Sequence, residues 1–121
     1  MSLKRILVCD DEAPMRELVQ LVLGGGYEFR EASDGLECAA LARALKPDLV
    51  ILDVMLPGKS GLELLPELRL DPDLAATRTL VLTAWDHLAA EAVAAGADRF
   101  FLKPFEPDEL RRAVAELLSG C

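Results

Sequence analysis

The stretch Leu49-Val50-Ile51-Leu52-Asp53 carries the pattern that decides the fold: four apolar residues in succession, ended abruptly by an acid. A continuous apolar run of this length predicts a strand that is buried on both faces, which is typical of parallel sheets. The same pattern occurs at residues 6–9, where the apolar run ends at Asp10 and Asp11. We therefore expect two buried strands whose carboxyl ends both carry acids.

Outward from these two strands, segments of helical periodicity alternate with further short apolar segments. Strands are predicted at residues 6–9, 27–32, 49–52, 79–82 and 99–102, and helices at about 14–23, 36–45, 60–70, 88–95 and 107–118. Five strands that alternate with five helices indicate an α/β fold, in which right-handed crossovers cover both faces of a parallel sheet. No linker or repeat interrupts the pattern, so we expect one domain over residues 1–121.

The composition excludes several classes of protein. The 121 residues contain 13 basic and 21 acidic side chains, a net charge of −8, which argues against binding to nucleic acids or anionic membranes. No apolar run approaches the roughly 18 residues of a membrane span. The three cysteines Cys9, Cys38 and Cys121 form no CxxC pair, so we expect neither a disulfide nor a zinc site. We interpret Cys9 and Cys38 as small buried apolar residues. This cysteine content is typical of a protein in the reducing cytosol.

Polar residues end four of the predicted strands: Asp10 with Asp11, Asp53, Thr83 and Lys103. Ligands of open parallel sheets bind at the carboxyl ends of the strands. Crowded carboxylates repel one another, so we expect a hard divalent cation such as Mg²⁺ among them. These residues suit the formation of an aspartyl phosphate, in which a carboxylate attacks a phosphoryl group. We expect Asp53 to be the nucleophile, and Lys103 and Thr83 to contact phosphoryl oxygens.

At these spacings the motifs resemble the receiver domains of two-component response regulators, which have the flavodoxin-like (βα)₅ fold. The resemblance extends over essentially all 121 residues. The segments that carry it are the acid pair at residues 10–11, residues 52–58 with Gly61, residues 82–84, and residues 96–98 leading to Lys103-Pro104-Phe105.

The resemblance implies a role for each matching residue at the metal site. Asp11 is implied to be a direct ligand of Mg²⁺ or Mn²⁺, and Asp10 to act partly through water. Asp53 is implied to be both the phosphoacceptor and a ligand, and the backbone carbonyl of Met55 a further ligand.

The remaining matches concern the response to phosphorylation. Thr83 and Phe100 match the switch residues of the family, and Lys103 matches its lysine. The Lys103–Pro104 bond is implied to be cis, a geometry that proline makes accessible.

The function implied by the resemblance is signalling. A sensor histidine kinase or phosphotransfer protein would transfer phosphate to Asp53. The phosphorylated domain would then change the face built by the fourth helix, last strand and fifth helix, which contacts an output domain or a second copy. Such a cytoplasmic module is not an enzyme beyond its own phosphorylation and dephosphorylation. The sequence of residues 54–58 is most similar to that of receivers attached to winged-helix transcription factors. No winged-helix domain is expected within these 121 residues.

Three alternatives bear on this interpretation. An aspartyl-phosphate phosphohydrolase usually has a second acid two residues after its nucleophile, where this chain has Met55. A flavin carrier needs a hydroxyl- and glycine-rich loop after its first strand, where residues 10–12 are all acidic. A receiver that signals by protein contacts alone, independently of phosphorylation, stays open on the sequence.

Two departures from the family pattern lie between Thr83 and Lys103. This segment is about two residues shorter than is usual in the winged-helix subfamily, so we expect the fourth helix to depart from the family pattern in length or orientation. Trp85 is bulky for a position that flanks the phosphorylation pocket. We expect its ring to shield the phosphate from water.

Overall fold

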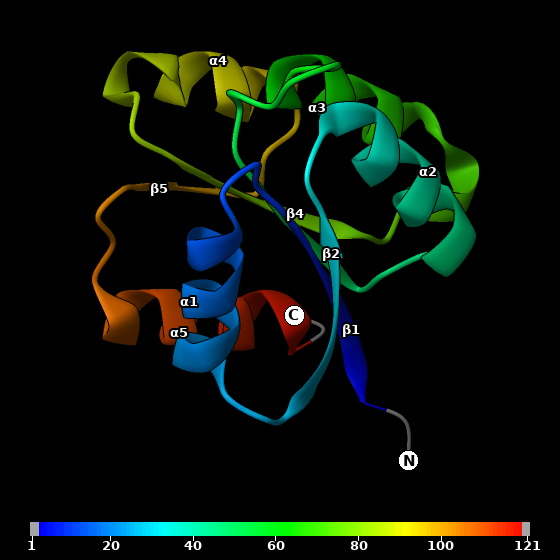
Figure 1. The fold of residues 1–121 in the computed structure, drawn as a ribbon. Helices are drawn as coiled ribbons and strands as arrows, with labels where there is room; N and C mark the ends of the chain where they lie inside the picture. The colour runs from blue at the N-terminus through cyan, green and yellow to red at the C-terminus, as the bar shows by residue number, and fades with distance from the viewer. Residues whose placement is uncertain (1–2, 120–121) are drawn as a thin grey trace.

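The computed structural model describes residues 3–119, in which five parallel strands form one sheet of order β2-β1-β3-β4-β5 (Figure 1). The strands are β1 (Lys4–Cys9), β2 (Tyr27–Ala32), β3 (Leu49–Leu52), β4 (Arg78–Thr83) and β5 (Arg99–Leu102). The α-helices are α1 (Ala13–Leu23), α2 (Gly35–Leu45), α3 (Gly61–Leu70), α4 (Ala89–Ala95) and α5 (Pro107–Leu118). The α/β fold expected from the alternating pattern is confirmed.

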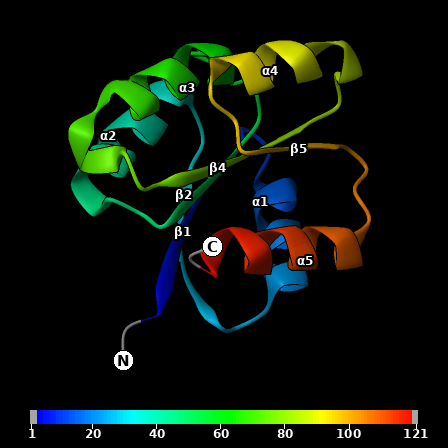
Figure 2. The same cartoon turned by 180° about the vertical axis from the view of Figure 1, so that it is seen from behind.

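The helices cover both faces of the sheet. Helices α2, α3 and α4 lie on one face, and α1 and α5 lie on the other, as the two opposite views show (Figures 1 and 2). The hydrophobic core is correspondingly divided into two clusters of buried residues, one on each side of the sheet. None of the helices in residues 3–119 is long and apolar enough to cross a membrane.

The central strand β3 is apolar throughout because it is covered on both faces. Val50 and Leu52 belong to the cluster beneath α2 and α3, whereas Leu49 and Ile51 belong to the cluster beneath α1 and α5. Successive side chains of a strand point to opposite faces, so a strand covered on both faces has no position for a polar side chain.

The α4 region is shorter and less regular than the other crossovers. A 3₁₀ turn, η2 (Asp86–Leu88), precedes the seven-residue α4, and Gly96, which caps the end of α4, has a φ of 121°. The sequence predicted one helix over residues 88–95, and the structure confirms it to within a residue at its start. A second 3₁₀ turn, η1 (Pro72–Leu74), lies between α3 and β4 and was not predicted.

The cysteine interpretation was wrong in one respect. Cys9 at the end of β1 and Cys38 in α2 form a disulfide, with their Cα atoms 6.1 Å apart. Both residues are buried, as expected. The two cysteines are 29 positions apart in sequence, and α1 and β2 lie between them, so only the folded topology reveals that they are neighbours. Cys121 lies outside the described residues.

Candidate functional site

The carboxyl ends of β1 and β3 bring two acids together in a largely buried position. The two strands are paired in register, with Cys9 opposite Leu52, and the Asp53 N–H donates to the carbonyl oxygen of Cys9 at 3.1 Å. Asp10 and Asp53 directly follow these strands and are only 3% and 8% exposed. Burial of two neighbouring carboxylates is costly unless positive charge compensates it.

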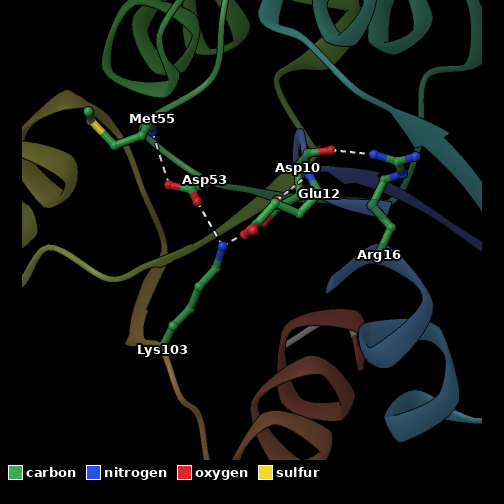
Figure 3. A network of polar contacts seen from close by, with 6 residues as sticks. All are labelled: Asp10, Glu12, Arg16, Asp53, Met55 and Lys103. Carbon is green, nitrogen blue, oxygen red and sulfur yellow. Dashed lines mark hydrogen bonds and ion pairs between the residues drawn. The ribbon is translucent and has the colours of Figure 1, made fainter. Parts of the chain in front are cut away.

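Lys103 supplies that positive charge. Its Nζ donates to Oδ2 of Asp10 at 2.6 Å and to Oδ2 of Asp53 at 2.8 Å, so the ammonium lies between the two carboxylates (Figure 3). Burial by itself lowers the pKa of Lys103, but the hydrogen bonds to Asp10 and Asp53 and the negative charges of these two carboxylates together outweigh it, so the net effect is a raised pKa. The lysine therefore stays protonated and offsets the repulsion between the acids.

The first acidic loop offers further carboxylate oxygens. Carboxylate oxygens of Asp10, Asp11 and Glu12 all lie within 4.8 Å of one another, and Asp11 and Glu12 are exposed. The Glu12 N–H donates to Oδ1 of Asp10 at 3.0 Å. Several carboxylates with open access to water are the donor set that Mg²⁺ or Mn²⁺ prefers, so these residues fit a hard divalent cation. Glu12 was not among the predicted ligands, and its only signal in the sequence is its position next to the acid pair.

The loop after β3 fixes the Asp53 carboxylate. The Met55 N–H donates to Oδ1 of Asp53 at 3.0 Å, while the Met55 side chain extends away from Lys103 (Figure 3). Helix α3 begins against this loop at Gly61. A Cβ at Gly61 would lie 2.6 Å from the carbonyl oxygen of Asp53, a separation that real Cβ atoms do not adopt. Glycine is therefore required for α3 to start so close to the acid.

Thr83, the last residue of β4, differs from the other buried threonines. The hydroxyl groups of Thr77 and Thr79 donate to the carbonyl oxygens of Pro47 and Gly96, at 2.8 and 3.1 Å. The Thr83 side chain is fully buried, and its Oγ1 has no hydrogen-bond partner among residues 3–119. Buried hydroxyls almost always have a hydrogen-bond partner, so a buried hydroxyl without one calls for an explanation. The Thr83 hydroxyl is free to form a hydrogen bond with a group that enters the site.

Arg16 contacts the site, although no pattern in the sequence predicted this contact. Its Nη1 donates to the backbone carbonyl oxygen of Asp10 at 2.6 Å (Figure 3). Its Nε donates to Oε1 of Glu31, also at 2.6 Å. Hydrogen bonds from Arg16 and then from Gln20 hold the pKa of Glu31 below its usual range, against a smaller opposing effect of burial. Helix α1 and strand β2 thus jointly fix the peptide that follows Asp10.

The remaining predicted residues lie on β5 and in the loops that follow β4 and β5. Phe100 is half-buried on β5 and packs against the core beneath α2 and α3. The Lys103–Pro104 peptide bond is cis. Trp85 is 47% exposed, and its ring meets that of His87 edge-on, with centroids 5.9 Å apart.

Comparison with known proteins gives consistent matches. The family model "Response regulator receiver domain" matches residues 6–115. The phosphate regulon transcriptional regulatory protein PhoB of Pseudomonas aeruginosa is 41% identical over 110 residues, which are 88% of this chain and 48% of that protein. The DNA-binding response regulator MtrA of Mycobacterium tuberculosis H37Rv is 38% identical over 110 residues, 88% of this chain and 47% of that protein. The chain thus spans about half the length of these curated relatives.

Solved structures are similar over the whole fold. The chemotaxis response regulator CheY4 of Vibrio cholerae has a TM-score of 0.88 and 31% sequence identity, with 97% of this chain and 100% of that chain covered.

Proposed function

This chain belongs to the family of response regulator receiver domains of two-component systems, and we propose that it accepts a phosphoryl group on Asp53 from a sensor histidine kinase or phosphotransfer protein. One observation carries the proposal. The Asp53 carboxylate is buried beside Asp10, and the protonated Lys103 bridges the two. A receiver needs this combination, because the acceptor must be ionised and the charge of the incoming phosphoryl group must be offset.

The phosphoryl transfer is a single displacement at the phosphorus atom. An Asp53 carboxylate oxygen attacks the phosphorus atom, a new O–P bond forms, and the P–N bond to the donor histidine breaks. Lys103 stabilises the negative charge that develops on the phosphoryl oxygens. Asp10, Asp11, Asp53 and the Met55 backbone carbonyl would hold Mg²⁺ or Mn²⁺, which neutralises phosphoryl charge in reactions of this class.

The unpaired hydroxyl of Thr83 supports a response to phosphorylation. A phosphoryl oxygen on Asp53 offers the partner that this buried Oγ1 lacks. A new contact of this kind shifts the population of conformers, provided that it is stronger in one conformer than in the other. Thr83 is joined to the start of the β5–α5 loop, since the Lys103 N–H donates to the Thr83 carbonyl oxygen at 2.8 Å. Movement of Thr83 is therefore transmitted to β5.

The face of α4, β5 and α5 is the surface on which this response acts. A groove of about 610 Å³ lies there, and its lining includes Ala89, Phe100, Leu102, Phe105 and Glu109. A rearrangement of Phe100 changes the wall of this groove directly. The partner on this face is an output domain or a second copy of the chain. The domain works in the cytoplasm and catalyses only its own phosphorylation and dephosphorylation.

Intact-mass measurement tests this proposal. Incubation with Mg²⁺ and acetyl phosphate is expected to add one phosphoryl group, about 80 Da, to the wild type. The Asp53→Ala variant, and the wild type with a chelator, should gain none. No gain in a folded wild-type protein would overturn the proposal and favour a receiver that acts by protein contacts alone.

A further inference from the structure

The pair of Cys9 and Cys38 plays no part in the proposed phosphotransfer, yet it lies beside that site. We propose that the two cysteines form a reversible redox site, in which a peroxide closes the disulfide and thereby strengthens Mg²⁺ binding at the acidic loop. The second half of this inference rests on the proposed function, because it requires that the loop bind Mg²⁺.

Cys9 touches both acids of the site through the backbone. It is the last residue of β1 and immediately precedes Asp10. Its carbonyl oxygen accepts the N–H of Asp53 at 3.1 Å. A covalent bond at Cys9 therefore restrains the backbone that precedes Asp10. It also restrains the carbonyl group to which the Asp53 N–H is hydrogen-bonded.

Cys38 lies in a helix that supports the other side of the site. Helix α2 begins at Gly35, whose N–H donates to the carbonyl oxygen of Pro57 at 2.9 Å. The contact is so close that a Cβ at Gly35 would lie 1.7 Å from the carbonyl oxygen of Lys59. The disulfide thus joins the strand that carries Asp10 to the helix that packs on the loop following Asp53.

The surroundings accommodate both redox states of the pair. Cys9 and Cys38 are 1% and 0% exposed and belong to one apolar cluster, where two thiols pack as small apolar side chains. Their Cα separation of 6.1 Å lies within the range of disulfides. Disulfides of cytosolic proteins are usually transient and often sense redox conditions. Burial excludes bulky oxidants, and a small peroxide reaches the pair through local opening of the fold.

The chemistry balances with a peroxide as the oxidant. One cysteine sulfur attacks hydrogen peroxide, the O–O bond breaks, and a sulfenic acid and one water are formed. The second thiol attacks that sulfur, so that the S–S bond forms, the S–O bond breaks, and a second water leaves. Two thiols and one hydrogen peroxide give one disulfide and two waters. A dithiol reductant reverses the reaction by thiol–disulfide exchange.

Oxidation is expected to act on the acidic loop because that loop lies inside the closed ring. Cys9 and Cys38 are 29 residues apart, and Asp10, Asp11 and Glu12 directly follow the first of them. A cross-link removes open conformations of the enclosed chain. Metal binding then requires less ordering of the loop, so the Kd for Mg²⁺ falls on oxidation.

The experiment uses a Cys121→Ser background, which leaves only Cys9 and Cys38 as thiols. One sample is reduced with dithiothreitol and another is treated with hydrogen peroxide, and both are alkylated in urea. The oxidised sample should be lighter by about 2 Da and take up no alkyl group, whereas oxidation of methionine adds about 16 Da. The reduced sample should take up two alkyl groups. Mg²⁺ titration, followed by the fluorescence of Trp85, should give a Kd about threefold lower in the oxidised form.

A matched control removes the pair without removing the site. In Cys38→Ala with Cys121→Ser, peroxide treatment should leave the Mg²⁺ Kd unchanged. The inference is overturned if both thiols remain open to alkylation after peroxide treatment, or if the oxidised and reduced forms bind Mg²⁺ equally. Equal binding in both forms leaves the proposed phosphotransfer intact, whereas the absence of Mg²⁺ binding in both forms contradicts the two proposals together.

Discussion

Arg16 donates a hydrogen bond of 2.6 Å to the backbone carbonyl oxygen of Asp10. The Arg16 side chain is only 15% exposed, and its Nε lies 2.6 Å from Oε1 of Glu31. A planar guanidinium fixed in this way defines the orientation of the peptide between Asp10 and Asp11. Arg16 therefore positions the start of the acidic loop without being a metal ligand itself.

Replacing Arg16 by Gln is expected to weaken Mg²⁺ binding by about tenfold, because residues that orient ligands commonly contribute that much to metal affinity. Titration of the Trp85 fluorescence with Mg²⁺ measures the effect. Arg30→Gln is the matched control, since Arg30 pairs with Glu28 away from the acidic loop. Equal Kd values for the two variants would contradict the positioning role of Arg16.

The pKa of Glu31 predicts how this pair depends on pH. The Arg16 hydrogen bond, followed by that of Gln20, lowers the pKa of Glu31 below its ordinary value of 4.5. The folded protein thus binds this proton less readily than the unfolded chain does, and Glu31 stabilises the fold above pH 4.5. This stabilisation should be lost as the pH falls through the lowered pKa. The effect should be small, because 43% of the Glu31 side chain is exposed.

Urea unfolding of the wild type and of Glu31→Gln at a series of pH values measures that contribution. The difference in the free energy of unfolding should be constant above about pH 5 and shrink below pH 4.5. A difference that grows as the pH falls would contradict the assignment.

Thr83→Val is expected to raise the free energy of unfolding of the unphosphorylated domain by about 1 kcal/mol, since it removes a buried hydroxyl that has no partner. Thr79→Val is the control on the same strand, because its hydroxyl accepts the Asp98 N–H at 3.2 Å and donates to Gly96. That substitution should lower the free energy of unfolding by about 1–2 kcal/mol. Equal destabilisation by both changes, measured by urea unfolding, would show that the Thr83 hydroxyl is paired.

Much of the fold could be predicted because its pattern is local. The apolar run of β3 and the capping box of α3, in which Ser60 accepts the Glu63 N–H at 3.2 Å, are both readable within a few residues. Three of the predicted strand ends carry Asp10, Asp53 and Lys103, which the structure brings into contact, since parallel strands share the edge at which they end.

The contacts that the sequence did not reveal join residues that no short pattern relates. Arg16 reaches Asp10 and Glu31 only because α1 packs beside the first two strands, and its sequence position is that of an ordinary helix arginine. The proximity of Cys9 and Cys38 likewise depends on α2 crossing over the end of β1. The unpaired state of the Thr83 hydroxyl depends on its whole environment and has no sequence signal.

Trp85→Ala is expected to speed the loss of phosphate from Asp53 about fivefold, which corresponds to about 1 kcal/mol of barrier. The physical reason is readier access of water to the phosphoryl group, because Trp85 lies two residues after Thr83 and its ring is partly exposed. The rate is measured from the decay of the phosphorylated intact mass after removal of acetyl phosphate. Trp85→Phe keeps a ring and should decay at an intermediate rate; an Ala variant as slow as the wild type would remove the shielding role.

The central claim is that Asp53 itself receives the phosphate, and borohydride trapping tests it most directly. Borohydride reduces an aspartyl phosphate to homoserine, which lowers the residue mass by about 14 Da. After incubation with Mg²⁺ and acetyl phosphate, the tryptic peptide of residues 44–59 should carry this loss at Asp53 and none at Asp48, which serves as the internal control. Loss at Asp48, or at neither residue in a protein that has gained phosphate, would contradict the assignment of Asp53.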